Sequence, residues 1–168
     1  MVKIAKTTRE AAGIEEEGAM EKVANKLIAA GRSGKLKGAG FYTYEDGKRG
    51  SIWSGLAELF PPAEVQPSIA DIKDRLMFIE AIETAKTFEE GVVTSAAHAN
   101  IGSIFGIGFP ASTGGAAQFI TGYDAADGTY GLDAFIKRAN ELAAAYGERF
   151  APTPYLLEMA AKGESFPA

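Results

Sequence analysis

The sequence of 168 residues contains no cysteine and only one histidine. The absence of cysteine excludes disulfides, thiolate metal sites and cysteine nucleophiles, and it fits a cytoplasmic protein. No apolar run approaches the roughly 18 residues that a membrane-spanning helix needs, so we expect no membrane span. The N-terminal segment MVKIAKTTRE is too charged for a secretory signal peptide.

Positive charge is also scarce. The chain has 17 Lys and Arg against 22 Asp and Glu, which gives a net charge of −5. No basic stripe alternates with aromatic residues, so nucleic-acid binding is excluded as a predicted function. The apolar content of 46% is enough for a real core, and the length suits one ordinary domain or two very small ones.

Apolar residues at helical spacing recur through the chain and predict an all-α protein. The predicted helices cover residues 18–30, 68–90, 96–103, 112–122, 132–146 and 154–163, and one short helix is expected within residues 51–60. The first seventeen residues show no pattern of a self-contained element. Almost nothing has the pattern of a strand, apart from a short aromatic alternation at Phe41, Tyr42 and Tyr44 before the turn Asp46-Gly47.

The longest predicted helix, residues 68–90, carries two apolar stripes side by side. Ser68 is a suitable N-cap, Asp71 follows at capping-box spacing, and Gly91 ends the helix. Because the apolar face is wide, we expect this helix to be contacted on two sides. The stripes are Ile69, Ile72, Leu76 and Ile79, and Phe78, Ile82 and Ala85.

Gly106, Gly108 and Ala111 match the dinucleotide-binding pattern G-x-G-x-x-A, and Asp124 and Asp127 follow at about the distance of a ribose-binding acid. The pattern binds a cofactor only where a buried strand enters it and a helix leaves it. Here the entering segment TSAAHANIGSIF has the pattern of a helix, and a proline interrupts the exit. We therefore predict no cofactor-binding residue in this segment.

The glycines Gly102, Gly106 and Gly108 are predicted instead to allow close backbone approach or sharp turns between helices. His98 would be the natural base of an acid–base enzyme at neutral pH. It lies between alanines, however, with no acid close in sequence to orient it. We expect it to face solvent or to cap a helix, and we predict no catalytic residue.

The acidic residues do not predict a metal site. Glu15, Glu16 and Glu17 form a run and Glu89 and Glu90 a pair, but metal binding or glycosidase chemistry would require these acids to converge in the fold. Solvated helix faces are the expected structure. The segment GYDAADGTYG is predicted to be a loop, and it lacks the ligand spacing of an EF-hand.

The segment GRSGKLKG places Arg32, Lys35 and Lys37 beside flexible backbone. It matches no P-loop, so an ordinary basic surface loop is expected, although phosphate binding stays an alternative. Trp53, together with Phe41 and Tyr42, is predicted to lie in the core rather than to form a ligand platform.

A weak internal echo, LIAAGRSG from Leu27 and MAAKGESF from Met159, suggests a repeat. Residues 1–67 would then be the tail of a first helical repeat with a Gly/Lys-rich loop and a Pro-rich linker, and residues 68–168 a second repeat. The chain also opens without a patterned first element. We therefore expect a cut inside a longer protein, with Met1 either an internal start or an added residue.

Several segments together resemble the 3-hydroxyacyl-CoA dehydrogenases, in particular their multifunctional forms in fatty-acid β-oxidation. GRSGKLKGAGFYTY resembles the end of the family's first C-terminal domain. DIKDRLMFIEAIETAKTFEEGVV, IGSIFGIGFPASTGG and ERFAPTPYLLEMAAKGESF resemble its second C-terminal domain. The resemblance implies an all-α helical bundle of the 6-phosphogluconate dehydrogenase C-terminal-domain-like type, with a truncated first repeat.

In that family NAD and the catalytic residues belong to an N-terminal Rossmann domain, and a hydratase module lies further upstream. The resemblance therefore implies that the parent oxidises 3-hydroxyacyl-CoA to 3-oxoacyl-CoA with NAD. This chain would cover the acyl-CoA cleft and pack domains or subunits, without binding a cofactor, a metal or the reacting atoms itself. His98 would not be the catalytic histidine.

The resemblance leaves open whether Arg32, Lys35 or Lys37 touches the CoA phosphates. Without the Rossmann domain and the first repeat, the chain should expose an apolar surface and self-associate. The alternative is a free-standing helical interaction or dimerisation module without enzymatic activity. An enzyme that uses His98 is the third possibility.

Overall fold

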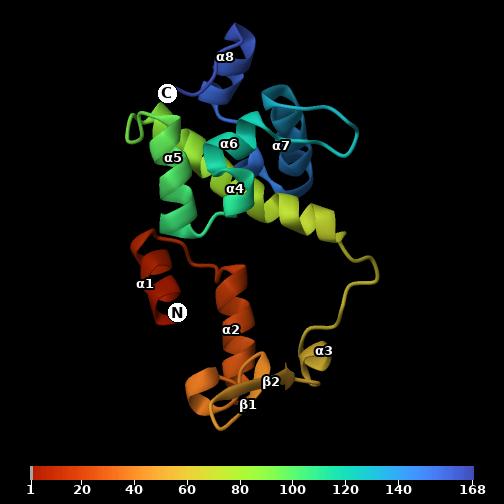
Figure 1. The fold of residues 1–168 in the computed structure, drawn as a ribbon. Coiled ribbons are helices and arrows are strands. Elements are labelled where there is room, and N and C mark those ends of the chain that lie inside the picture. The colour runs from red at the N-terminus through yellow and green to blue at the C-terminus, as the bar shows by residue number, and fades with distance from the viewer. Residues whose placement is uncertain (1) are drawn as a thin grey trace. The chain divides into compact units, whose positions relative to one another are not determined.

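The computed structural model describes residues 2–168, and the chain divides between Gln66 and Pro67 into two compact units (Figure 1). Met1, and with it the question of a natural start, lies outside the described residues. The prediction of an all-α protein is confirmed, because helices dominate both units and the one sheet has two short strands. No helix within residues 2–168 is long and apolar enough to cross a membrane.

The first unit contains helices α1 (Val2–Ala11), α2 (Ala19–Ala29) and α3 (Leu56–Leu59), a 3-10 turn at Lys35–Lys37 and one hairpin. Helix α1 corrects the expectation that the first seventeen residues form no element. The helix buries none of its residues, which is why its apolar pattern was too weak to identify it. Ion pairing of Arg9 with Glu21 of α2 holds it in place instead.

The hairpin pairs β1 (Tyr42–Glu45) with β2 (Lys48–Ile52) in antiparallel register. Asp46 and Gly47 form its two-residue turn, and both have positive φ angles, 49° and 74°. Asp-Gly is the sequence that such a tight turn favours, because glycine tolerates the left-handed region. The short helix expected within residues 51–60 is present as α3, Leu56–Leu59, and Ser51 and Ile52 before it belong to β2.

The first unit has almost no core of its own. Leu27 is the only large apolar side chain that is buried among residues 2–66, and Glu21, paired with Arg9, is also buried. Large apolar side chains stay exposed on α1, α2 and β2 and in the loop before β1, among them Ile4, Met20, Ile28, Phe41 and Ile52. A unit that buries so little apolar surface cannot be stable alone.

The second unit is a helical domain with a continuous core. It contains α4 (Ile69–Glu89), α5 (Ala96–Gly102), a π-helical turn (Ser103–Ile107), a 3-10 turn (Ala111–Thr113), α6 (Ala116–Thr121), α7 (Leu132–Tyr146), a 3-10 turn (Glu148–Phe150) and α8 (Pro154–Lys162). Helix α4 packs against α6 and α8, and α7 packs against the same two helices.

An aromatic cluster fills the centre of this core. Phe78 of α4 stacks on Phe135 of α7 with ring centroids 4.3 Å apart, and Tyr123 meets the face of Phe78 edge-on at 5.0 Å. Such pairs add about 0.5–1.5 kcal/mol beyond the burial of their area. Of the two apolar stripes predicted for α4, the one with Phe78, Ile82 and Ala85 is buried in this core.

The helix ends of the second unit follow the predicted capping residues. Ser68 Oγ accepts a hydrogen bond from the Asp71 amide at 3.0 Å, and Thr153 Oγ1 accepts one from the Leu156 amide at 3.3 Å. Gly91 and Gly163 end α4 and α8 in the left-handed conformation. The capping box is only half formed, because the Asp71 carboxylate binds side chains of α7 instead of returning to Ser68.

Helices α5 and α6 come very close together at one glycine. Gly115 has a φ of 107°, and a Cβ atom there would lie 2.4 Å from the Asn100 Cα. Gly102 and Gly106 have no such neighbour within 4 Å, so the prediction of close approach at these two positions is wrong. Gly108, with a φ of 80°, does make a predicted turn.

Candidate functional site

The G-x-G-x-x-A segment follows helices rather than a strand. Residues 96–107 continue from α5 into the π-helical turn, and Gly108 then reverses the chain before Pro110. The short α6 begins five residues after Ala111. Because a dinucleotide fold needs a buried strand at this point, these residues do not fit a nicotinamide cofactor.

The two acids that follow have other contacts. Asp127 accepts hydrogen bonds from Lys137 Nζ at 2.6 Å and from the Thr129 hydroxyl at 2.6 Å. The hydrogen bond from Lys137 holds the pKa of Asp127 well below its usual range. Asp124 pairs through its backbone with Tyr130 at the base of the same loop. Both acids therefore shape the loop between α6 and α7.

His98 lies exposed on α5, as predicted. Its backbone amide donates to Ser95 Oγ at 3.3 Å, which caps the helix. Within residues 2–168 the imidazole makes no hydrogen bond to a carboxylate that could orient it. The geometry gives His98 no partner for general-base chemistry.

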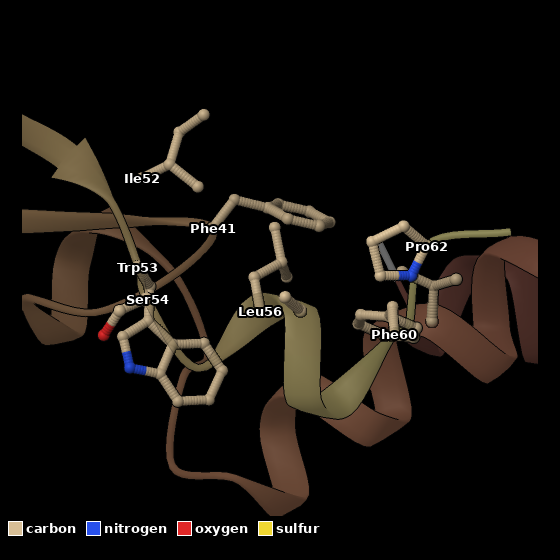
Figure 2. A pocket seen from close by; sticks show the side chains of 9 residues that line it. Phe41, Ile52, Trp53, Ser54, Leu56, Phe60 and Pro62 are labelled. Atoms are coloured by element: carbon tan, nitrogen blue, oxygen red, sulfur yellow. The ribbon is translucent and has the colours of Figure 1, made fainter. Parts of the chain in front are cut away.

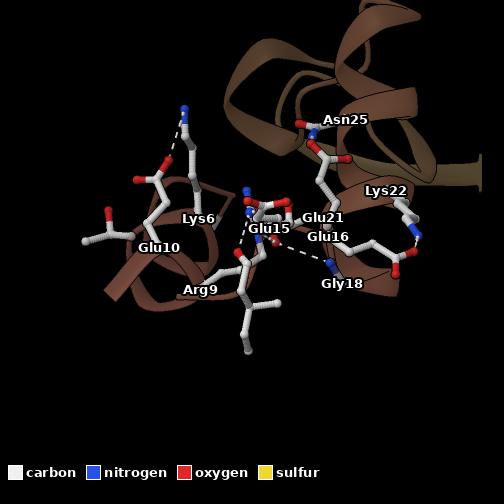
Figure 3. A network of polar contacts seen from close by, with 12 residues as sticks. Lys6, Arg9, Glu10, Glu15, Glu16, Gly18, Glu21, Lys22 and Asn25 are labelled. Atoms are coloured by element: carbon white, nitrogen blue, oxygen red, sulfur yellow. Dashed lines mark hydrogen bonds and ion pairs between the residues drawn. The ribbon is translucent and has the colours of Figure 1, made fainter. Parts of the chain in front are cut away.

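The acidic run in the first unit is occupied by ion pairs and hydrogen bonds (Figure 3). Glu16 pairs with Lys22 at 2.6 Å, and the Glu17 carboxylate accepts a hydrogen bond from the side-chain amide of Asn25 at 2.9 Å. The Glu15 carbonyl accepts from Arg9, whose Nε binds the buried Glu21 at 2.9 Å. In the part of the chain that the structure describes, no group of three His, Cys, Asp or Glu could hold a metal ion.

Glu89 and Glu90 lie exposed at the end of α4.

In the glycine-rich loop, Arg32 is a structural residue. Its Nε donates to the Gly40 carbonyl at 2.7 Å, and its guanidinium lies 4.3 Å from the centre of the Trp53 ring. Lys35 and Lys37 are exposed on the 3-10 turn. Since Arg32 is already engaged, only the two lysines can meet an anion without breaking existing contacts.

The aromatic residues of the first unit line a groove rather than a core, which corrects the prediction for Trp53 and Phe41 (Figure 2). The open groove of about 670 Å³ is bounded by Val23, Phe41, Ile52, Trp53, Ser54, Leu56, Ala57, Phe60 and Pro62. The Arg32 guanidinium lies over the Trp53 ring. Gly55 also lies against the indole, and a Cβ atom at Gly55 would be only 2.4 Å from it. Tyr42 is only half-buried, so its predicted place in a core is wrong as well.

A polar cluster around Arg138 of α7 was not identified from the sequence. Arg138 donates to Asp74 at 2.8 Å and to Asp71 at 2.9 Å, both on α4, and to Glu141 at 3.1 Å. The Tyr146 hydroxyl donates to Asp71 at 2.6 Å, and this bond lowers the pKa of Asp71. The cluster therefore joins α4 and α7 through ion pairs and hydrogen bonds.

The outer stripe of α4 is exposed, in contrast to its buried stripe. Ile69 and Leu76 are 69% and 64% exposed, Ile72 is also exposed, and Ile79 is half-buried. A hollow of about 320 Å³ lies along this stripe and is bounded by Ile72, Arg75, Leu76, Ile79, Arg149 and Phe150. The expectation that α4 is contacted on two sides is met on one side only within the second unit.

A second exposed apolar surface lies on α5 and the π-helical turn. Val92, Ile101, Phe105 and Ile107 are all exposed, Phe105 to 86%. The stretch from Gly91 to Tyr123 contains no Asp, Glu, Lys or Arg. Exposed apolar side chains in a segment without charge are typical of protein interfaces.

The chain is similar to curated proteins named fatty acid oxidation complex subunit alpha. The subunit from Vibrio parahaemolyticus serotype O3:K6 is 34% identical over 143 residues, which are 83% of this chain and 19% of the relative. The subunit from Pseudomonas savastanoi pv. phaseolicola is 34% identical over 151 residues, 86% of this chain and 20% of the relative. The subunit from Pseudomonas syringae pv. tomato is 36% identical over 147 residues, which are 83% of this chain and 19% of the relative.

The chain thus spans about a fifth of the length of the curated relatives it matches. No protein-family model matches the chain. The resemblance to multifunctional β-oxidation enzymes that the sequence motifs indicate is confirmed by these relatives.

Proposed function

We propose that this chain, which matches about a fifth of fatty acid oxidation complex subunit alpha, works as a packing and cleft-covering segment of a β-oxidation enzyme. The similarity over 83% of the chain carries the proposal. The whole protein would oxidise 3-hydroxyacyl-CoA to 3-oxoacyl-CoA with NAD. NAD and the catalytic residues would belong to a Rossmann domain outside this chain, and the chain alone would be inactive.

The surfaces of both units support a packing role. The first unit leaves the groove at Trp53 and Phe41 open and buries almost no apolar side chain. The second unit has a complete core but exposes the outer stripe of α4. Exposed apolar side chains grouped in this way mark surfaces that another protein surface covers. The missing first repeat and Rossmann domain would supply that cover.

A chimera tests the proposal. In the Vibrio parahaemolyticus subunit, the segment that the chain matches is replaced by this chain. NADH oxidation with acetoacetyl-CoA is then measured for the chimera, for the subunit without the segment, and for this chain alone. We expect activity only in the chimera, because the segment completes the fold around the cleft.

Two outcomes would contradict the proposal. Turnover by the chain alone would show that it carries catalytic residues, and His98 would then be mutated first. A chimera as inactive as the deletion, although folded by circular dichroism, would instead favour a free-standing interaction module.

Self-association of the isolated chain is part of the same proposal. The uncharged surface at Ile101, Phe105 and Ile107 is suited to pair with a second copy, because an isologous contact there brings no like charges together. Phe105→Ser should lower the apparent mass in sedimentation velocity at concentrations where the parent chain is a dimer. A chain that is monomeric at every concentration would contradict this part of the proposal.

A further inference from the structure

The outer stripe of α4 has the spacing of a helix-docking seam. Ile69, Ile72, Leu76 and Ile79 follow one another at intervals of three, four and three residues. This is the alternation that brings apolar side chains of two helices into register along one line. Ile69, Ile72 and Leu76 are exposed and thus available to a partner helix, while Ile79 is half-buried against the core at the end of the seam.

Two arginines flank the seam. Arg75 of α4 and Arg149 of the 3-10 turn after α7 both line the hollow beside Leu76. Neither arginine forms an ion pair with any acid of residues 2–168. Asp71 and Asp74, which precede Arg75 on α4 by four residues and one residue, are already bound by Arg138.

Arg75 is held in place before any partner arrives. Its guanidinium lies 4.1 Å from the centre of the Tyr146 ring, and the Tyr146 hydroxyl is fixed by its bond to Asp71. Arg149 lies 5.0 Å from the ring of the buried Phe150. A side chain that is ordered in advance loses less entropy when it forms an ion pair across an interface.

We propose that the α4 seam docks an amphipathic helix whose apolar stripe is flanked by aspartate or glutamate, with the acids paired to Arg75 and Arg149. The inference rests on the proposed packing role, because it names the partner of that surface. A second copy of the seam is a poorer partner, because in an antiparallel pair Lys73 and Arg75 of both copies would meet at the centre of the seam and repel one another.

Two matched peptides test the inference. Both are helical, carry the same apolar stripe and a fluorescent label, and differ only in their flanking residues, which are all Glu in one and all Lys in the other. Fluorescence polarisation with the full chain measures binding. We expect the Lys peptide to bind at least about tenfold more weakly, because like charges face each other across the seam.

Charge reversal in the chain gives the second arm of the test. In the double variant Arg75→Glu with Arg149→Glu, the preference between the two peptides should invert. Arg49→Glu is the matched control, since Arg49 also lies over a tyrosine ring, 4.9 Å from the centre of Tyr42, but outside the seam. That control should leave the preference unchanged, and Leu76→Ser should weaken both peptides equally.

Equal binding of the two peptides, or no binding of either, would overturn the inference. So would a dimer of the full chain that Leu76→Ser dissociates, since the seam would then belong to a second copy. Circular dichroism of each variant excludes unfolding as the cause of lost binding. The peptide assay does not depend on dehydrogenase activity, so an inactive chimera would leave this result intact.

Discussion

Among single residues, Arg138 makes the most polar contacts between helices in the second unit. It joins α7 to Asp71 and Asp74 of α4, and its side chain is only 24% exposed. Hydrogen bonds to charged groups contribute about 1.5–3 kcal/mol when they are shielded from water in this way. The cluster therefore acts as a tie between two helices that lie far apart in sequence.

Replacing Arg138 with alanine should lower the free energy of unfolding by about 2 kcal/mol, because three acids lose their common partner. Urea denaturation at pH 7 measures the change. Lys86→Ala is the control, since Lys86 forms a single exposed ion pair with Glu83, and such pairs contribute about 0–1 kcal/mol. Equal losses in the two variants would show that the cluster adds nothing beyond an ordinary surface pair.

Tyr123 should make the second unit sensitive to alkali. Burial, with a smaller effect of Asp74, raises the pKa of its phenol from 10.0 to about 12. A raised folded-state pKa means that the folded chain keeps a proton that the unfolded chain loses. The stabilisation is complete below pH 10 and is lost as the pH rises toward 12.

The variant Tyr123→Phe keeps the ring and removes the titrating group. The difference in unfolding free energy between the parent chain and this variant should be constant up to pH 10 and then decline. Urea titrations at several pH values measure it. Other tyrosines with raised pKa, such as Tyr155, cancel in the difference. A difference that stays flat to pH 12 would contradict the assignment.

At the scale of elements, the contact of α5 with α6 depends on the absence of a side chain at Gly115. Gly115→Ala combines a positive φ with a clash at Asn100, whereas Gly128→Ala has a positive φ and open space. The strain common to both costs about 1–2 kcal/mol. We expect Gly115→Ala to cost roughly a further 1–3 kcal/mol because the backbones must separate. Thermal unfolding of the two variants measures the difference, and equal melting temperatures would refute it.

The helices of the second unit were predictable because their signals are local. Ser68, Gly91, Thr153 and Gly163 each act within one turn of the chain, and each ends or begins its helix as expected. The sequence indicated the turn Asp46-Gly47 and the aromatic alternation before it, but not β2, because that strand is stabilised by pairing across the turn rather than by a periodic apolar face.

The binding surfaces could be foreseen only in part. The sequence predicts two apolar stripes on α4 but does not say which one stays exposed. The cluster around Arg138 joins residues 64–75 positions apart, a distance over which spacing carries no information. The same holds for Arg75 and Arg149, which come together only through the fold.

At the scale of the whole molecule, the two units differ in how much they bury. Residues 67–168 contain a continuous aromatic core, whereas among residues 2–66 Leu27 is the only large apolar side chain that is buried. Cooperative unfolding requires a core large enough to offset the conformational entropy of the chain. The second unit meets this condition and the first does not.

We therefore expect a chain of residues 67–168 to melt cooperatively, within about 5 °C of the full chain. A chain of residues 2–66 should show no cooperative transition. Differential scanning calorimetry of the three proteins tests both statements. A sharp transition in the isolated first unit would mean that its hairpin and helices need no external cover.

The uncharged surface around Ile101 and Phe105 has a practical consequence for mapping assemblies. No lysine or arginine lies between Lys86 and Lys137, so trypsin releases α5, α6 and the turns between them as one long peptide. Amine-reactive crosslinkers have nothing to attach to there. A complex formed through this surface would thus leave no lysine crosslinks, and a photoreactive amino acid at position 105 would be needed to reveal its partner.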